Sequence, residues 1–288
     1  MPQTINTNIA SLNAQRSLNM SQNSLATSMQ RLSSGLRVNS AKDDAAGLAI
    51  AERMNAQVRG MNVAARNAND GISMAQTAEG ALGKVSESLQ RMRELAVQSA
   101  NATNSGSDKD SLDKEFGELS KEIQRVLGAT SFNGKHVLGT DAGTMQFQVG
   151  ANTTTNDTIN ITTIDFASEP TITSVAGTDN VGTGRSVIDN TAAVSAIHTV
   201  VDNIDAALNT VNNERATLGA SQSRFESVIS NLQLSVENQS AARARIMDAD
   251  FAAETANLSR AQILQQAGNA MVAQANQLPQ QVLRLLQG

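Results

Sequence analysis

Residues 194–236 read VSAIHTVVDNIDAALNTVNNERATLGASQSRFESVISNLQLSV, and their apolar side chains recur at the spacing of one long helix. Arg215 and Gln222 interrupt this apolar series, which otherwise advances by three or four residues for about six heptads. A repeat of this length is typical of a helix that packs along another helix in a coiled coil. The apolar residues of the series are Val194, Ile197, Val201, Ile204, Leu208, Val211, Leu218, Phe225, Ile229, Leu232 and Val236.

Both ends of the chain carry similar apolar series. The N-terminal series predicts a helix over residues 4–36, which Gly35 and the polar stretch after it should end. Its members are Ile5, Ile9 and Leu12 and then, after a slip of one residue, Leu18, Leu25, Met29, Leu32 and Leu36. At the other end, one position recurs every seven residues as Leu264, Met271, Leu278 and Leu285. Pro279 lies in this C-terminal series and should kink the helix without ending it.

The two terminal helices are unusual because they lack acidic residues. No Asp or Glu occurs before Asp43 or after Glu254, and the polar positions hold Gln, Asn, Ser and Thr. Burial of an amide costs far less free energy than burial of a charge when the amide is hydrogen-bonded. These helices are therefore suited to contact other helices on several sides, which a polymer of many chains would provide.

The middle of the chain predicts further helices and a few strands. Asp43 or Asp44 should cap a second helix that continues to about residue 100. A third helix should run over residues 112–126 and end at Gly128. Residues 131–186 instead contain the turn dipeptide Asn133-Gly134, alternating apolar residues, and Ile172 after a proline. This pattern indicates short strands on a solvent-exposed insertion.

The predicted fold class is mainly α, a long antiparallel coiled-coil helical bundle with a small β-hairpin insertion. Residues 1–42 plus 250–288 are expected to form terminal inner-core helices that polymerise as a coiled coil. Residues 43–249 are expected to form an outer helical domain, with residues 131–189 as a short surface insertion rich in β structure.

Composition argues against several functional classes. The net charge of −5 argues against a nucleic-acid partner, and the absence of Cys excludes disulfides and thiolate metal sites. No apolar run approaches the ~20 residues of a membrane span, and the N-terminus does not resemble a secretory signal. His136 and His198 lie in no catalytic or metal-binding motif, and Asp248 and Asp250 fit helix capping better than metal binding. We therefore expect no enzyme activity, no cofactor and no metal.

Several long stretches are similar to bacterial flagellins. They are RLSSGLRVNSAKDDAAGLAIAERM at 31–54, NANDGISMAQTAEGAL at 67–82, LQRMRELAVQSAN at 89–101, and the closing stretch over 238–286. The resemblance extends over about residues 1–139 and 190–288. It implies a structural subunit that polymerises into the extracellular flagellar filament after export through the flagellar type III apparatus.

The same resemblance implies specific partners and residues. The partners are identical subunits, an export chaperone on the C-terminal helix, the filament cap, the hook–filament junction protein and the host Toll-like receptor 5. Receptor recognition is implied at Arg91, Leu95 and Glu115. The inner-core residues expected to drive polymerisation are Ile5, Ile9, Leu12, Leu25, Leu32, Leu264, Met271, Leu278 and Leu285.

Two alternatives share the amphipathic terminal helices. A hook–filament junction protein would use the same helices but assemble as a short ring. A membrane-active amphipathic protein would bind lipid through them, although few Lys, Arg or Trp residues are available for that role.

Overall fold

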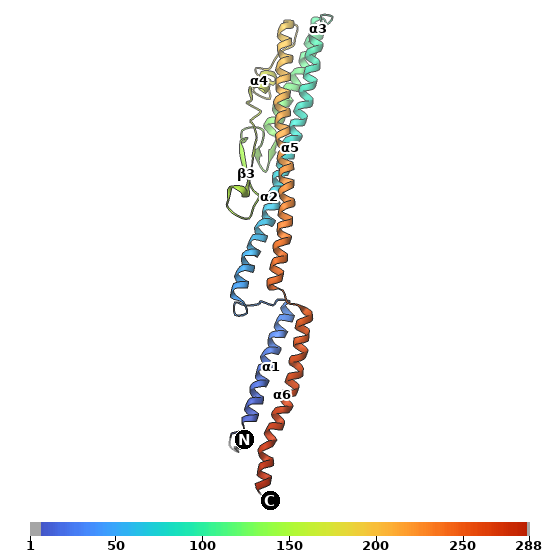
Figure 1. Ribbon diagram of the computed structural model, residues 1–288. Helices are drawn as coiled ribbons and strands as arrows, with labels where there is room; N and C mark the ends of the chain where they lie inside the picture. Colours follow the sequence, from blue (N-terminus) through green and yellow to red (C-terminus); the bar gives the residue numbers. More distant parts are fainter. Residues whose placement is uncertain (1–6, 287–288) are drawn as a thin grey trace. The chain divides into compact units, whose positions relative to one another are not determined.

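The computed structural model describes the backbone of residues 7–286 and the side chains of residues 7–277 (Figure 1). The chain forms two compact units, the first made of Met1–Ala56 with Glu237–Gly288 and the second of Gln57–Val236. The helices are α1 (Ile9–Ser34), α2 (Ala45–Ser99), α3 (Gly106–Ala129), η1 (Thr155–Asp157), α4 (Pro170–Ala176), α5 (Val194–Met247) and α6 (Phe251–Leu286). The strands are β1 (Ser131–Phe132), β2 (Lys135–His136), β3 (Thr144–Gln148) and β4 (Thr158–Thr162).

In the first unit, α1 and α6 lie side by side (Figure 1). The side chain of Asn8 caps α1 by accepting a hydrogen bond from the Ser11 amide at 3.1 Å. Gly35 ends the helix with a φ of 71°, a left-handed conformation that glycine adopts without steric strain. The predicted end of this helix is thus confirmed. At the other end of the chain, α6 continues through Pro279 as predicted.

The two residues predicted to cap α2, Asp43 and Asp44, have different roles. Asp44 caps the helix, since its side chain accepts a hydrogen bond from the Gly47 amide at 2.8 Å. Asp43 holds the preceding turn instead, because its Oδ2 accepts from the amides of Asn39 and Ser40. These hydrogen bonds lower the pKa of Asp43 below its ordinary value.

The core of the second unit follows the heptad pattern of α5. Its buried positions recur every seven residues, and α2 contributes a matching apolar face. The recurring residues are Ile197, Ile204, Val211, Leu218, Phe225 and Leu232. Arg215 and Gln222, the two polar residues that interrupt the series, both contact the Glu79 carboxylate of α2. The distance to Glu79 is 3.9 Å from Arg215 and 2.9 Å from Gln222. The long helical pairing predicted from residues 194–236 is therefore confirmed.

The β segments form two separate hairpins. β1 pairs with β2 across the Asn133-Gly134 turn, whose residues have φ angles of 49° and 81°. β3 pairs antiparallel with β4, so that Met145 lies opposite Ile161 and Phe147 opposite Ile159. The predicted turn at Asn133-Gly134 and the predicted short strands are confirmed.

Residues 131–189 differ from the expectation in one element. Most residues of the segment are at least partly exposed, as a surface insertion requires, but its large apolar side chains belong to the same core as α2, α3 and α5. Ile172 lies in helix α4, not in a strand, because Pro170 occupies the first turn, where its missing N–H costs no hydrogen bond. The buried residues of the segment include Val137, Leu138, Ile159, Ile161, Phe166, Ile172, Val175 and Ile188.

Candidate assembly surface

The contact between α1 and α6 is a continuous heptad seam. Apart from Arg31, the residues of α1 that are shielded from solvent advance by three and four: Ser11, Ala14, Leu18, Ser21, Leu25, Ser28 and Leu32. Those of α6 up to residue 277 do the same: Glu254, Leu258, Ala261, Gln265, Gly268, Val272 and Ala275. Small and polar residues alternate with a few aliphatic ones, so this seam buries less apolar surface than an ordinary coiled coil.

The seam corrects part of the predicted packing within the chain. Leu25 and Leu32 lie in it, whereas Ile9 and Leu12 lie outside it and expose 61% and 52% of their surface. The predicted slip of one residue is absent, because Ser11 and Ala14 continue the series of Leu18 toward the N-terminus. The prediction followed only large apolar residues and therefore missed small ones in the same series.

The C-terminal series is displaced from the seam in the same way. Leu264 and Met271 recur every seven residues as predicted, but they expose 50% and 62% of their surface. The seam with α1 uses Ala261, Gly268 and Ala275, three or four residues away. Ile5 lies outside the described residues, and so do the side chains of Leu278 and Leu285.

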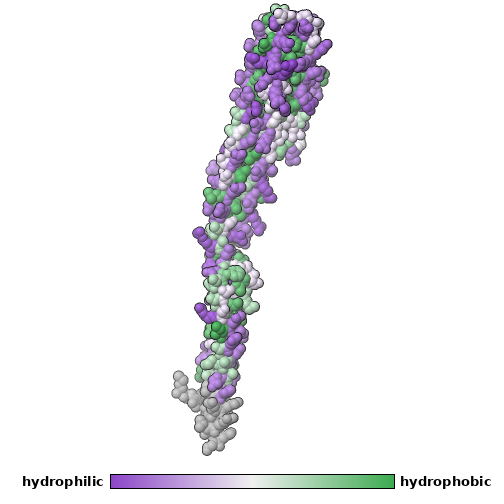
Figure 2. Space-filling model, turned by 90° about the vertical axis from the view of Figure 1, so that its right-hand side faces the viewer, coloured by the Kyte–Doolittle hydropathy of each residue, from purple (hydrophilic) through white to green (hydrophobic). Residues whose placement is uncertain are grey.

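The first unit consequently exposes many large apolar side chains on both terminal helices. We call this set the terminal apolar surface: Ile9, Leu12, Met20, Met29, Ile263, Leu264 and Met271. Figure 2 shows green apolar patches between polar ones along the part of the surface formed by α1 and α6. Extended exposed apolar surface marks an interaction site in a soluble protein.

A shallow groove between α1 and α6 adjoins this surface. It has a volume of about 700 Å³, and its lining combines apolar residues such as Met20 and Leu264 with hydroxyl side chains, two Asn side chains and the charged Arg31, Glu254 and Arg260. The hydroxyls of Ser21, Ser24 and Thr27 donate to carbonyl oxygens of their own helix, at 3.0 Å each. These donors therefore need no outside partner, and an apolar side chain can occupy the groove without leaving them unpaired.

The residues implied in receptor recognition occupy two different environments in the second unit. Arg91 donates to Glu115 at 2.8 Å and to Glu94 at 2.9 Å, and these contacts raise the pKa of Arg91. Arg91 and Glu115 are each about half exposed, so they form a surface pair. Leu95 is fully buried in the core. Val97 of the same helix is an exposed apolar residue that lines a groove with Arg93 and Glu94, and it was not among the predicted residues.

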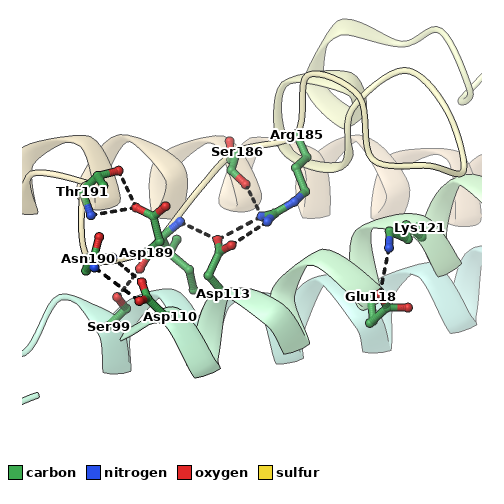
Figure 3. A network of polar contacts seen from close by, with 11 residues as sticks. Ser99, Asp110, Asp113, Glu118, Lys121, Arg185, Ser186, Asp189, Asn190 and Thr191 are labelled. Carbon is green, nitrogen blue, oxygen red and sulfur yellow. Dashed lines mark hydrogen bonds and ion pairs between the residues drawn. The ribbon is translucent and has the colours of Figure 1, made fainter. Parts of the chain in front are cut away.

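A polar network on α3 also escaped the sequence analysis (Figure 3). Asp113 binds the Arg185 guanidinium and the Ile188 amide, and Asp110 accepts from the Asn190 amide. Farther along α3, Ser120 donates to the Ala176 carbonyl at 2.6 Å, and Gln124 donates to the Gly177 carbonyl at 2.5 Å. These α3 side chains are spaced by three, seven and four residues, which places them on one face of the helix, and this spacing is the signal that could have revealed the network. They tie residues 176–190, which we call the strap, along the helix.

The described residues also bear on two other functional classes. Within residues 7–277, no group of three or more His, Asp or Glu side chains is placed to hold a metal ion. Among the helices that the structure describes, none has a segment long and apolar enough to cross a membrane.

Comparison with known proteins gives the family. The family model described as the bacterial flagellin N-terminal helical region matches residues 5–142, and the corresponding C-terminal helical region matches residues 201–286.

Two flagellins match nearly the whole chain. The flagellin of Halalkalibacterium halodurans is 47% identical over 282 residues, which cover 98% of this chain and 99% of that protein. The flagellin of Xenorhabdus nematophila is 46% identical over 314 residues, covering 99% and 100%. The crystal structure of Bacillus cereus flagellin is 33% identical, covers 58% of this chain and 88% of its own, and superposes with a TM-score of 0.47. Because the sequence similarity extends over the full length of both relatives, the chain belongs to the bacterial flagellin family.

Proposed function

We propose that this flagellin is a structural subunit of the bacterial flagellar filament and that α1 and α6 supply its main contacts between copies. The observation that carries this proposal is the terminal apolar surface, which the pairing of α1 with α6 leaves exposed. In a homopolymer, identical chains would contact the terminal apolar surface from several sides at once.

The chemistry of the two helices supports packing against sister copies. Burial of each exposed Ile, Leu or Met side chain contributes about 1.5–3 kcal/mol, which must offset the entropy of ordering the helices. Residues 1–42 and 255–288 contain no acidic side chains and only six basic ones, so stacked copies would bring few charges together. Residues 1–42 plus 250–288 accordingly form the polymerising inner core in this proposal, and residues 43–249 form the outer part.

This role places the protein outside the cell, in the flagellum, with no catalytic activity. Export through the flagellar type III apparatus, a chaperone on α6, a filament cap and a hook–filament junction protein are the partners that the role requires. A host Toll-like receptor 5 would contact the exposed Arg91 and Glu115 pair. Leu95 would support that surface from beneath, since its side chain is buried.

Growth from filament seeds tests the proposal. Met271→Glu places a carboxylate on the terminal apolar surface, where burial of an unpaired charge is costly, so the variant should not elongate seeds. Gln76→Glu is the matched control, because it adds one carboxylate at an exposed position of α2 in the second unit. Circular dichroism should show that both variants keep the helices of the second unit.

Two outcomes decide against the proposal. Normal elongation by the Met271→Glu chain would show that the terminal apolar surface does not join the copies. If the wild-type chain forms only short rings and never long filaments, the hook–filament junction role applies instead.

A further inference from the structure

Gly268 lies at the centre of the seam, where α1 and α6 approach each other closely. A Cβ atom at this position would be 3.1 Å from Cδ1 of Leu18 and 3.8 Å from its Cα. Glycine is among the poorest helix formers, so its presence inside a long helix calls for a local reason. Here the missing side chain leaves a notch that the Leu18 side chain fills.

Polar contacts fix the same alignment at the two ends of the seam, and at one end the Asn8 side chain donates to the Ala275 carbonyl at 2.8 Å. Ser11 of α1 donates to the Asn276 side chain of α6 at 2.8 Å. Arg31 lies 3.9 Å from Glu254, and both side chains are largely shielded from solvent. Residue numbers therefore rise along α1 while they fall along α6, and Leu18 opposite Gly268 lies between the two ends.

This alignment pairs large residues with small ones along the seam. Seven residues beyond Leu18 on α1 is Leu25, and seven residues before Gly268 on α6 is Ala261. Leu25 thus lies in the layer of Ala261, just as Leu18 lies in the layer of Gly268. In the layers that flank these two the order is reversed, with Ala14 in the layer of Val272 and Ser28 in that of Leu258, and the layer between them pairs Ser21 with Gln265.

The notch alone does not define one register. A slide of one heptad would bring Leu25 over Gly268 and Leu18 against Ala275, which are again pairs of large and small residues. The same slide would move Ser11 away from Asn276 and Arg31 away from Glu254. Steric fit and polar contacts together therefore specify the observed register.

We propose that Gly268 is a positioning residue for assembly: its notch receives Leu18 and sets the separation and register of α1 and α6. The register in turn determines how the apolar side chains of the two helices combine into one surface. This inference rests on the proposed function only where filament growth is the measurement.

The experiment measures register directly through a cysteine pair. The chain contains no cysteine, so Ser21→Cys with Gln265→Cys, in the layer between those of Leu18 and Leu25, gives a unique pair for a short thiol-reactive crosslinker and keeps the polar contacts that specify the register. In this background, Gly268→Leu should lower the crosslinking yield and the rate of seeded elongation by about tenfold each, because Leu18 no longer fits. Gly219→Leu is the control, since a Cβ at Gly219 would meet no neighbouring atom within 4 Å.

The double variant Leu18→Ala with Gly268→Leu, called the exchanged pair, distinguishes a loss of steric fit from a general destabilisation of α6. It restores one large and one small residue in the same layer and should recover both crosslinking and elongation. The proposal is overturned if Gly268→Leu behaves like wild type, or if the exchanged pair stays as defective as the single variant. Failure of the wild-type chain to elongate would instead refute the proposed function, and crosslinking of the soluble chain would still test the notch.

Discussion

The Arg185 guanidinium donates two hydrogen bonds to the Asp113 carboxylate, at 2.9 and 2.5 Å, and so ties the strap to α3 (Figure 3). The same carboxylate accepts from the Ile188 amide at 2.9 Å, and Asp113 exposes only 9% of its surface. The contact with Asp113 raises the pKa of Arg185. The Asp113 side chain of α3 therefore pairs with the charge of Arg185 and also accepts a hydrogen bond from the backbone of the strap at Ile188.

Removal of this carboxylate should destabilise the second unit. Asp113→Ala leaves the Arg185 guanidinium and the Ile188 amide without their acceptor, at an expected cost of about 3 kcal/mol. Urea denaturation followed by circular dichroism measures the change. Glu118→Ala on the same helix removes only an exposed ion pair with Lys121 and should change stability little. Equal effects of the two substitutions would contradict the role given to Asp113.

Glu214 should make the stability of the second unit depend on pH. Its side chain is 6% exposed, one carboxylate oxygen has no partner among the described residues, and burial raises its pKa. The folded chain therefore binds this proton more readily than the unfolded chain, so the carboxylate lowers stability at neutral pH. That penalty disappears as the pH falls through the folded pKa toward the unfolded value.

Glu214→Gln should accordingly stabilise the protein by about 1 kcal/mol at neutral pH, and by much less near the ordinary pKa of Glu. Thermal unfolding of the soluble chain at the two pH values measures the difference. A gain that is the same at both pH values would show that ionisation of Glu214 is not its cause.

Gly71 and Gly80 of α2 should respond to alanine in opposite directions. A Cβ at Gly71 would be 2.8 Å from the Phe225 ring, which packs edge-to-face on Phe147 with ring centroids 5.6 Å apart. Gly71→Ala should therefore cost about 1–3 kcal/mol. At Gly80 no atom lies within 4 Å of the added Cβ, so alanine should stabilise the helix by about 0.5–1 kcal/mol. Thermal melts of the two variants test this difference in sign.

The sequence predicts the long helices of this fold well because their apolar residues are large and regularly spaced. Ile197, Val211 and Phe225 recur at multiples of seven and are all buried, and Gly35 ends α1 where its position indicates. The Asn133-Gly134 turn is equally local, since its positive φ angles suit those two residue types. Such features depend on neighbouring residues and need no knowledge of distant contacts.

Other features could not be predicted because they depend on residues far apart in the sequence. The pairing of Asp113 with Arg185 joins positions separated by 72 residues, and nothing near either one indicates the other. The large residues Ile9 and Leu12 do not mark the seam between α1 and α6, because small residues take the inward positions there. Ser11 and Gly268 become recognisable as seam residues only when the opposite helix is in place.

Hydrogen exchange compared between soluble chain and seeded filament tests most directly whether α1 and α6 join the copies. The account predicts that amides of α1 and of α6 exchange quickly in the soluble chain and slowly in the filament, because burial between copies stabilises them. Amides around Leu89 and Leu218, in the core of the second unit, should be protected in both states. Equal protection of α1 and α6 in the two states would contradict the account.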